Sequence, residues 1–442
     1  MKEAEAERFF YGFENHFFDM GLDNLRKFMQ TLGNPQDKVK VIHVAGTNGK
    51  GSVSSFIAEI LTEAGFKTGR YHSPAVFEKR EIIAVDGKPI SGEEFAVQVE
   101  LMKSAVEIAD KEGRLPTIFE LETALAYQYF AYSQCDFAVI ECGMGGLTDA
   151  TNITNSVVLS VFTSISMDHM AWLGNTLKEI AECKAGIIRK NIPAVIIEQD
   201  SQAMNVIEER ARCQNSRIIT VKKDNIKVLE STLKKQRFVY HSTLAWQEYE
   251  IQMSGRFQTE NGAEAIEAAC ELIRQGYIIE ESAVKQGLLK AVLPGRFQVI
   301  QNENPLILID GAHNPEAALR LRENITLLLR EYHIIFIMGV FADKDYEKVV
   351  EITCDLADNI YTVKADGKRA LDANILAQCV RSYGKEAYPA ESIPKALELA
   401  VSKAEELTAE TGRKSAVICF GSFSFLKYIK AAVEDRRKNN EN

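Results

Sequence analysis

The sequence lacks any apolar run that approaches the roughly 20 residues a membrane-spanning helix needs. Its first residues, MKEAEAERFFYGFE, are acidic and contain no apolar core, so we expect no signal peptide. No C-x-x-C pair occurs among the eight cysteines, which we interpret as free and mostly buried thiols. Free thiols in a chain of this length favour a reducing, cytoplasmic location.

An excess of positive charge is also missing. The formal net charge is -10, which disfavours general binding to nucleic acid or to anionic membranes. A polyanion such as ATP would therefore need a local positive site. With 442 residues the chain is long enough for two or three domains, and its composition, 46% hydrophobic and 26% charged, is that of an ordinary globular protein. We find no internal repeat and no Ser-His-Asp set at a spacing that suits nucleophilic catalysis.

Short apolar runs alternate with helix-like segments along the chain. Strands are predicted at Val39–Ala45, Phe137–Cys142, Val157–Thr163, Ala194–Glu198, Leu306–Asp310, Ile334–Met338, Ile360–Val363 and Ala416–Phe420. Helices are predicted at Val53–Ala64, Ile118–Ser133, Thr176–Ile188, Pro315–Arg330, Tyr346–Leu356, Ile393–Leu407 and Phe423–Val433. Such alternation favours parallel sheets that are covered on both faces.

The segment Arg217–Met253 differs, because its polar and apolar residues alternate and predict a small antiparallel sheet. After Leu293-Pro294-Gly295 the α/β rhythm restarts, so we place a domain boundary near Pro294. The prediction is an α/β protein with an ATP-binding domain at residues 1–294 and a Rossmann-like α/β domain at 295–442. The N-terminal domain would contain a P-loop-type parallel sheet and the small antiparallel sheet.

The strongest chemical signal is the loop between the first strand and the first predicted helix. Glycines let backbone amides converge on one point, and the following helix presents its positive end there. A lysine suits the outer phosphates of ATP, and a hydroxyl suits Mg²⁺. The strict pattern G-x-x-x-x-G-K-[ST] is not met, and the alternative is a glycine turn with a chance lysine. The predicted nucleotide loop is Gly46, Thr47, Asn48, Gly49, Lys50, Gly51 and Ser52.

This loop resembles the ATP loop of the Mur ligase superfamily, and its GKGS ending is similar to the folate branch, the folylpolyglutamate and dihydrofolate synthases. Further matches follow in the family's order: ECGMGGLTDATN from Glu141 to Asn152, Asp168-His169 with Lys184-Ala185-Gly186-Ile187, Gly295-Arg296-Phe297, and Asp310-Gly311-Ala312-His313-Asn314-Pro315. The resemblance implies an ATP-dependent amide ligase that passes through an acyl phosphate.

Three residues are candidate metal ligands. Glu141 ends an apolar strand at the edge where α/β proteins bind ligands. The resemblance implies that Ser52 and Glu141 hold one Mg²⁺ and that His169 with Glu141 holds a second. The alternatives are a solvated strand end for Glu141 and a surface histidine for His169.

Two further cations are candidate catalytic residues beside Lys50 and His169. Lys184 adjoins the apolar stripe of its predicted helix, where a lysine whose amine reaches solvent is the alternative. In the resembling family this lysine is often carbamylated, which gives Mg²⁺ another anionic ligand. Arg296 would bind the γ-phosphate as the domains approach, or else form an interdomain salt bridge.

The remaining site predictions concern ATP and the acceptor. By resemblance, Asp310 contacts nucleotide and His313 contacts the incoming amino acid; the alternative is that Asp310 caps a turn. Gln258 and Asn261 resemble the adenine-contacting segment, and the start of a helix explains them equally well.

Acceptor binding is predicted for a third group of residues. Phe119 and Glu120, in a Thr117-Ile118-Phe119-Glu120 string, resemble the residues that line the pterin side of the site. Ser73 resembles the first residue of the family's S-P-H loop, but Ala75 replaces the histidine.

Taken together, these matches predict a ligase that adds L-glutamate to dihydropteroate, to tetrahydrofolyl-glutamate or to both, with ATP and two Mg²⁺ ions. The chain is expected to act as a monomer, without nucleic acid or membrane. One alternative is a sister ligase that acts on a UDP-linked muramyl substrate, although few residues precede the loop strand to form a UDP domain. Another is a regulatory ATPase that makes no amide, which would not need the Asp310–Pro315 motif.

Overall fold

The computed structural model describes residues 1–12 and 21–441, which divide into two compact units. The first unit comprises Met1–Lys227, Arg237–Ile251 and Gln258–Val292. The second comprises Val228–Gln236, Gln252–Phe257 and the chain from Leu293 onward. The last passage between the units lies just before the boundary predicted at Pro294. The sequence analysis predicted a single boundary and did not predict that Val228–Gln236 and Gln252–Phe257 belong to the second unit.

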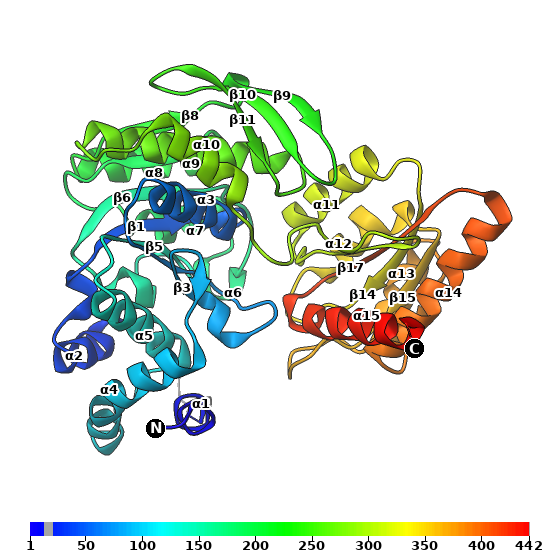
Figure 1. Cartoon of the computed structure of the whole chain (residues 1–442), viewed down its shortest axis with the longest axis horizontal. Helices are drawn as coiled ribbons and strands as arrows, with labels where there is room; N and C mark the ends of the chain where they lie inside the picture. The colour runs from blue at the N-terminus through cyan, green and yellow to red at the C-terminus, as the bar shows by residue number, and fades with distance from the viewer. Residues whose placement is uncertain (13–20, 442) are drawn as a thin grey trace. The chain divides into compact units, whose positions relative to one another are not determined.

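The first unit is built on an eight-stranded sheet in the order β4-β3-β2-β5-β1-β6-β7-β8. Strands β1, β3, β5, β6 and β8 of this sheet are labelled in Figure 1. From β2 to β8 all neighbours are parallel, while β3 and β4 are antiparallel additions at one edge. The strands are β1 (Lys40–Ala45), β2 (Thr68–Tyr71), β3 (Ile83–Val85), β4 (Lys88–Pro89), β5 (Phe137–Glu141), β6 (Val157–Phe162), β7 (Ala194–Ile197) and β8 (Ile218–Val221).

Ten α-helices in the described residues accompany this sheet: α1 (Glu3–Tyr11), α2 (Asp23–Thr31), α3 (Lys50–Glu63), α4 (Gly92–Lys111), α5 (Ile118–Tyr132), α6 (Met170–Leu173), α7 (Leu177–Ala185), α8 (Ser201–Cys213), α9 (Phe257–Arg274) and α10 (Glu281–Lys290). Short 3-10 turns lie at Pro35–Asp37, Lys79–Ile82, Ala150–Ile153 and Lys223–Asn225. Capping boxes begin α4, α5 and α7 and satisfy backbone amides at those helix starts. Helices α1, α2, α4 and α5 share one core with Val41, Ala138 and Ile140.

Strand β8 corrects one sequence prediction. Its alternating pattern suggested an antiparallel strand, but β8 pairs in parallel with β7, from Ala194 opposite Ile218 to Ile197 opposite Val221. The reason is the intervening helix α8, which supplies the crossover that a parallel neighbour requires. Alternation alone could not distinguish a half-buried edge strand of the large sheet from a strand of the small one.

The small antiparallel sheet forms from the rest of that segment. Its strands are β9 (Ile226–Ser231), β10 (Gln236–His241) and β11 (Trp246–Ile251), in the order β11-β10-β9. The tight turns between them, closed by Thr232 N donating to Lys235 O and Ser242 N donating to Ala245 O, permit only antiparallel neighbours.

The second unit contains a six-stranded sheet in the order β12-β13-β17-β14-β15-β16. Only β12 is antiparallel, so the predicted Rossmann-like architecture is confirmed. Its strands are β12 (Gln298–Gln301), β13 (Leu306–Ile309), β14 (His333–Met338), β15 (Asn359–Thr362), β16 (Ala387–Pro389) and β17 (Ser415–Phe420). Its helices are α11 (Pro315–Leu328), α12 (Tyr346–Thr353), α13 (Ala373–Ser382), α14 (Ile393–Thr411) and α15 (Leu426–Glu441), with 3-10 turns at Cys354–Leu356 and Phe423–Phe425.

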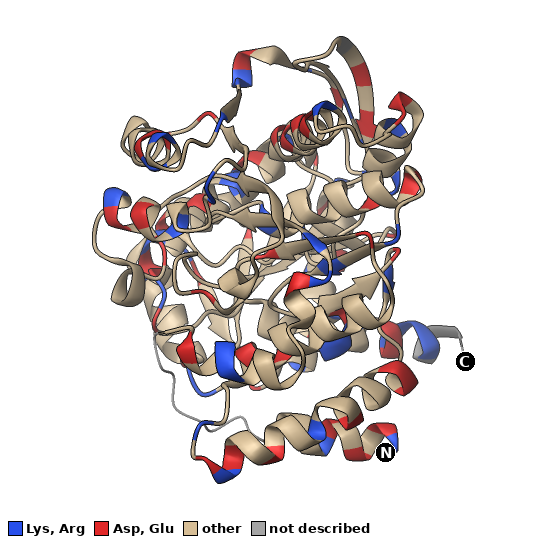
Figure 2. Cartoon of the chain, turned by 90° about the vertical axis from the view of Figure 1, so that its left-hand side faces the viewer, with Lys and Arg blue, Asp and Glu red and all other residues tan. Residues whose placement is uncertain are grey.

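Charged residues of both signs are interspersed over the helices in Figure 2, without a continuous positive stretch. This distribution agrees with the net charge of -10. A bound polyanion such as ATP would therefore need positive charge from a local site. Among the described residues, none of the helices combines the length and the apolar character that a membrane crossing requires.

Candidate active site

The predicted nucleotide loop is the turn between β1 and α3, and a second loop braces it. Thr47 N donates to Ser164 O at 2.7 Å, and Thr47 Oγ1 donates to Ser166 O at 3.1 Å. Ser166 N in turn donates to Thr47 Oγ1 at 3.0 Å. The loop after β6 therefore holds the nucleotide loop at the carboxyl edge of the sheet, where parallel α/β proteins bind their ligands.

Gly46 marks the closest approach within this brace. A Cβ atom at Gly46 would lie 1.8 Å from Thr163 Oγ1, closer than any real contact. We expect Gly46→Ala to displace the loop and to weaken ATP binding by roughly tenfold or more, because the phosphate-binding amides must converge on one point. Titration calorimetry with ATP checks this, with Gly65→Ala, where a Cβ meets nothing within 4 Å, as the control for glycine replacement at positive φ. Unchanged ATP affinity in Gly46→Ala would contradict the assignment of the loop.

Lys50 begins α3, and its ammonium group lies at the loop. Lys50 Nζ donates to Thr47 O at 3.1 Å and lies 3.8 Å from Glu141 Oε1. Ser52 is buried in the first turn of the same helix. Glu141 ends β5 and is only 3% exposed, which excludes the alternative of a solvated strand end. One cation, one hydroxyl and one carboxylate thus belong to neighbouring elements of the sheet's carboxyl edge.

Lys184 on α7 supplies a second cation to the same loop. Its side chain is buried, and Nζ donates to Gly46 O at 2.6 Å, so its amine does not reach solvent as the alternative required. Burial, and secondarily the charge of Lys50, lowers the pKa of Lys184 to about 7. An amine with this pKa is partly neutral near pH 7.

Asp149 is a residue of this region to which the sequence analysis gave no role. It is buried, and its carboxylate accepts from Met144 N at 2.7 Å and from Thr151 N at 3.0 Å. Burial raises the pKa of Asp149, and these hydrogen bonds oppose that rise. Asp149 therefore fixes the glycine turn that follows Glu141. An aspartate in a loop often accepts a hydrogen bond from the backbone two residues further on, and this common turn signal could have suggested the role.

His169 precedes α6 with a φ of 50°, in the left-handed region. Its Nε2 lies 3.8 Å from Asp168 Oδ2, and its backbone N donates to Asp168 Oδ1 at 2.8 Å. The imidazole is partly exposed at 39%, so a ligand can reach it. Its predicted role as a metal ligand beside Glu141 stays a prediction.

The first turns of α9 approach the nucleotide loop from another side. A Cβ atom at Gly49 would lie 2.6 Å from Asn261 Oδ1, so the Asn261 amide lies against the loop. Asn261 Nδ2 donates to Gln258 Oε1 at 2.8 Å. Gln258 Nε2 is buried and makes no hydrogen bond among the described residues. A buried donor of this kind suits the acceptor edge of a bound base.

The residues predicted to bind the acceptor lie near the ends of β2 and β5. Ser73 is half-buried just beyond β2, and the Phe119 ring lies against Gly143, where a Cβ would be 2.3 Å from the ring. Glu120 also has a structural role that the sequence analysis did not include. Its carboxylate accepts from Thr117 N at 2.8 Å and from Thr117 Oγ1 at 2.9 Å, and so caps α5.

In the second unit, the predicted residues gather around Phe423. Arg296 Cζ lies 4.6 Å from the centre of the Phe423 ring, and the His313 ring lies 5.9 Å from it. Asp310 is buried and accepts from Phe297 N at 2.7 Å and from Ala312 N at 2.8 Å, so it does cap the turn. Burial raises the pKa of Asp310, and the charge of Arg296 opposes that rise. No sequence signal indicated that Phe423 orients Arg296.

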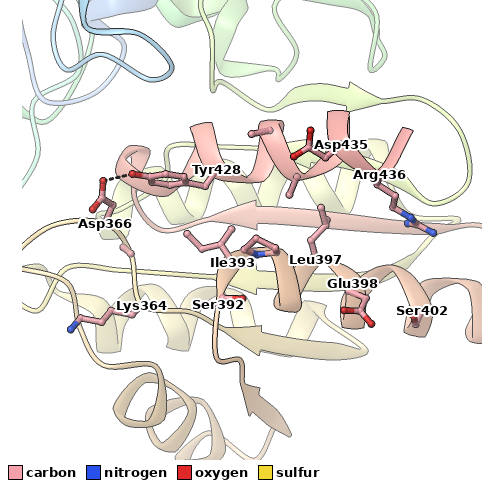
Figure 3. Close-up of a pocket in the computed structure, with 14 residues that line it drawn as sticks. Lys364, Asp366, Ser392, Ile393, Leu397, Glu398, Ser402, Tyr428, Asp435 and Arg436 are labelled. Atoms are coloured by element: carbon pink, nitrogen blue, oxygen red, sulfur yellow. Dashed lines mark hydrogen bonds between the residues drawn. The ribbon is translucent and has the colours of Figure 1, made fainter. Parts of the chain in front are cut away.

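A separate groove of about 770 Å³ lies between α14 and α15 of the second unit (Figure 3). Its floor includes Ile393 and Leu397, and the Tyr428 hydroxyl donates to Asp366 at 2.9 Å at one end. None of the site residues predicted from the sequence lines it.

Comparison with known proteins gives consistent matches over both units. Residues 44–269 match the Mur ligase middle domain, and residues 295–423 match the Mur ligase glutamate ligase domain. The dihydrofolate synthase/folylpolyglutamate synthase of Bacillus subtilis is 36% identical over 355 residues, which cover 79% of this chain and 82% of that protein. The protein of the same name from Escherichia coli is 30% identical over 422 residues, covering 95% and 92%.

Solved structures extend the likeness to the fold. Mycobacterium tuberculosis folylpolyglutamate synthase complexed with ADP superposes with a TM-score of 0.89 at 26% identity, covering 98% of each chain. Escherichia coli FolC in complex with DHPP and ADP superposes with a TM-score of 0.83 at 25% identity, covering 99% of each chain.

Proposed function

Because the chain belongs to the Mur ligases, and among them to the dihydrofolate synthase and folylpolyglutamate synthase family, we propose that it joins L-glutamate to a folate-type carboxylate at the expense of ATP. The family and the class of ATP-dependent ligase follow from both matched domains.

One observation carries the proposal: two lysines from different helices meet at one glycine loop. Lys50 donates to Thr47 O and Lys184 to Gly46 O, at 3.1 and 2.6 Å. The Lys50 ammonium and the helix N-terminus provide the local positive site that a chain of net charge -10 needs for ATP, and Lys184 brings a modifiable amine to the same loop.

The reaction has two displacements. An oxygen of the acceptor carboxylate attacks the γ-phosphorus, the bond from that phosphorus to ADP breaks, and an acyl phosphate forms. The neutral amine of L-glutamate then attacks the acyl carbon, phosphate leaves with the former carboxylate oxygen, and the amine loses a proton. Lys50 stabilises charge on the transferring phosphoryl group, and Arg296 is proposed to add a second donor. The braced loop fixes the phosphates before the attack.

A magnesium site fits the donors of the first unit. The buried Ser52 hydroxyl and the Glu141 carboxylate are oxygen ligands, which Mg²⁺ prefers, and Mg²⁺ usually completes its shell with phosphate oxygens and water. The described residues hold no group of three or more His, Cys, Asp or Glu side chains placed to bind a metal ion. Phosphates are therefore proposed as part of the coordination shell. When bound, Mg²⁺ neutralises phosphate charge; His169 and a carbamylated Lys184 are proposed for a second ion.

Binding of the nucleotide base is proposed for the start of α9. The buried Gln258 Nε2 has a hydrogen to donate, and Asn261 lies against Gly49 of the loop. Acceptor binding is proposed at Ser73, Phe119 and Glu120, and contacts from the second unit at Arg296, Asp310 and His313.

The acceptor is tested by measuring ADP release from the full-length enzyme. We expect release that depends on L-glutamate with dihydropteroate, with tetrahydrofolyl-monoglutamate or with both. L-aspartate, one methylene shorter, serves as the amine control, and a UDP-muramyl peptide acid tests the sister ligase. ADP release with the muramyl acid alone would sink the folate assignment. ATP turnover that ignores both acid and amine would sink the ligase.

Two expectations about the whole protein stay proposals. One chain carries all the proposed residues, so a monomer should suffice for activity, which light scattering at assay concentration checks. All eight cysteines are free, which supports a reducing compartment such as the cytoplasm.

A further inference from the structure

A buried hydroxyl on the nucleotide helix ties that helix to the end of the first unit. Ser55 Oγ, on α3, donates to the backbone oxygen of Val292 at 2.8 Å. Arg70 Nη1, on β2, donates to the same Ser55 oxygen at 2.6 Å. The hydroxyl thus accepts one hydrogen bond and donates another, and the guanidinium restricts the direction of its proton.

These two hydrogen bonds matter because of where Val292 lies in the sequence. Val292 is the last residue of the first unit, and Arg296, the proposed γ-phosphate donor, follows a few residues later. The preceding helix, α10, lies so close to α3 that a Cβ atom at Gly287 would be 2.4 Å from Ile60 Cα. Lys290 Nζ also contacts Glu63 Oε1 at 2.7 Å. The linker, residues 293–295 between Val292 and Arg296, therefore starts from a segment that is fixed to helix α3, whose first turn carries Lys50 and Ser52.

Arg70 connects the Ser55 hydrogen bonds to the face of the sheet that carries Glu141. Arg70 pairs with Val139 across parallel strands, and Glu141 lies two residues further along β5. Residues at paired positions, and residues two apart, point to the same face. Arg70 and Glu141 therefore share the face on which Arg70 reaches α3.

We propose that Ser55 is a positioning residue. Together with Arg70 it fixes the start of the linker to helix α3, and this fixed start allows Arg296 to reach the position in which it binds the γ-phosphate. This inference rests on the proposed function, and it adds residues that touch neither ATP nor acceptor. It predicts that losing the hydroxyl slows phosphoryl transfer without weakening nucleotide binding.

The neighbouring serine provides a matched control. Ser54 is also buried on α3, but its Oγ has no hydrogen-bond partner among the described residues. Ser54→Ala and Ser55→Ala remove the same atom from consecutive positions of one helix. We expect Ser55→Ala to lower kcat roughly tenfold or more, because small misplacements of a catalytic group are costly. The Kd for a non-hydrolysable ATP analogue should be unchanged, and Ser54→Ala should match the wild type in both.

A second variant separates positioning from stability. Ser55→Ala leaves the Arg70 guanidinium without its acceptor, which lowers stability, whereas Ser55→Ala/Arg70→Met removes both partners and should recover much of the melting temperature. The double variant should remain as slow as Ser55→Ala. If kcat recovers together with the melting temperature, Ser55 has only a structural role and the inference is overturned.

A double-mutant cycle with Arg296→Ala completes the test. Ser55→Ala should lower the kcat of the Arg296→Ala variant only slightly, because both changes remove the same contact between Arg296 and the γ-phosphate. Independent, multiplicative losses would overturn the inference, as would wild-type kcat in Ser55→Ala or in Arg296→Ala. Failure of the proposed function would be separately visible, because the wild type itself would then show no glutamate-dependent ADP release.

Discussion

Lys50→Ala is expected to abolish measurable amide formation, with kcat lower by roughly 10²–10³-fold or more, as for other losses of a charge donor to a transition state. The ammonium group lies 3.8 Å from Glu141 Oε1 and donates to Thr47 O, so it belongs to the loop before ATP binds. Its removal takes away a cation and leaves the buried Glu141 carboxylate without that partner. ADP release in the presence of acceptor and L-glutamate measures the effect.

The control for Lys50→Ala is a lysine of the same unit that lies away from the loop. Lys178 is on α7, its side chain is 68% exposed, and it faces Glu182 at 3.9 Å. Exposed pairs of this kind contribute little, so Lys178→Ala should keep wild-type kcat and melting temperature. Lys50→Ala should unfold at a lower temperature than the wild type, because the buried Glu141 carboxylate loses a partner, so ADP release is measured well below that temperature. If it joins acid and amine at the wild-type rate, the glycine turn is not the nucleotide site.

The sequence predicted the parts of the fold that depend on local pattern. A β-branched run before glycines, followed by an apolar helix, gave β1, the loop and α3 in order. The same reasoning located Glu141, because a strand buried on both faces reads as a continuous apolar run that ends at its first charged residue. The parallel partner of β8 could not be predicted in this way, since it depends on the crossover through α8 rather than on alternation.

Long-range contacts of the candidate site were beyond local pattern. Lys184 lies on an amphipathic helix and reads as a surface lysine, yet it reaches Gly46 across 138 positions of sequence. Arg70 and Ser55 carry no motif at all, and they became notable only when β2, α3 and the end of α10 were seen to share bonds. Glu120 is different, because its structural role could be read from local pattern. Thr117 and Glu120 form a T-x-x-E capping box, and the family resemblance assigns the same segment to acceptor binding.

The second large effect is expected at Lys184. Lys184→Met and Lys184→Arg should both lower kcat by roughly hundredfold, within the range for losing an electrostatic stabiliser. The two variants fail for different reasons: methionine removes the donor to Gly46 O, while arginine keeps a cation but cannot form a carbamate. If Lys184→Arg is as active as the wild type, the cation suffices and no carbamate is needed.

A carbamate at Lys184, if the proposal is right, makes activity depend on pH and CO₂. Only a neutral amine attacks CO₂, and because the pKa of Lys184 is about 7, the neutral fraction falls steeply below that pH. The wild type should therefore lose activity in CO₂-free buffer and regain it with bicarbonate, more readily at pH 8 than at pH 6. A carbamate carbon signal in NMR with ¹³C-bicarbonate, absent in Lys184→Arg, identifies the modified group. Full activity without CO₂ would exclude the carbamate.

In CO₂-free buffer, the same buried amine should also affect stability. Its folded pKa of about 7 lies below the ordinary value of 10.5, so between these limits the unfolded chain binds more protons than the folded one. The free energy of unfolding should therefore increase as pH rises from about 7 toward 10.5, and Lys184→Met should lack that increment. Denaturant unfolding of both proteins at several pH values isolates the contribution of Lys184, because all other groups are shared. Parallel curves would mean that Lys184 is not buried as a near-neutral amine, and the carbamate would then lose its physical basis.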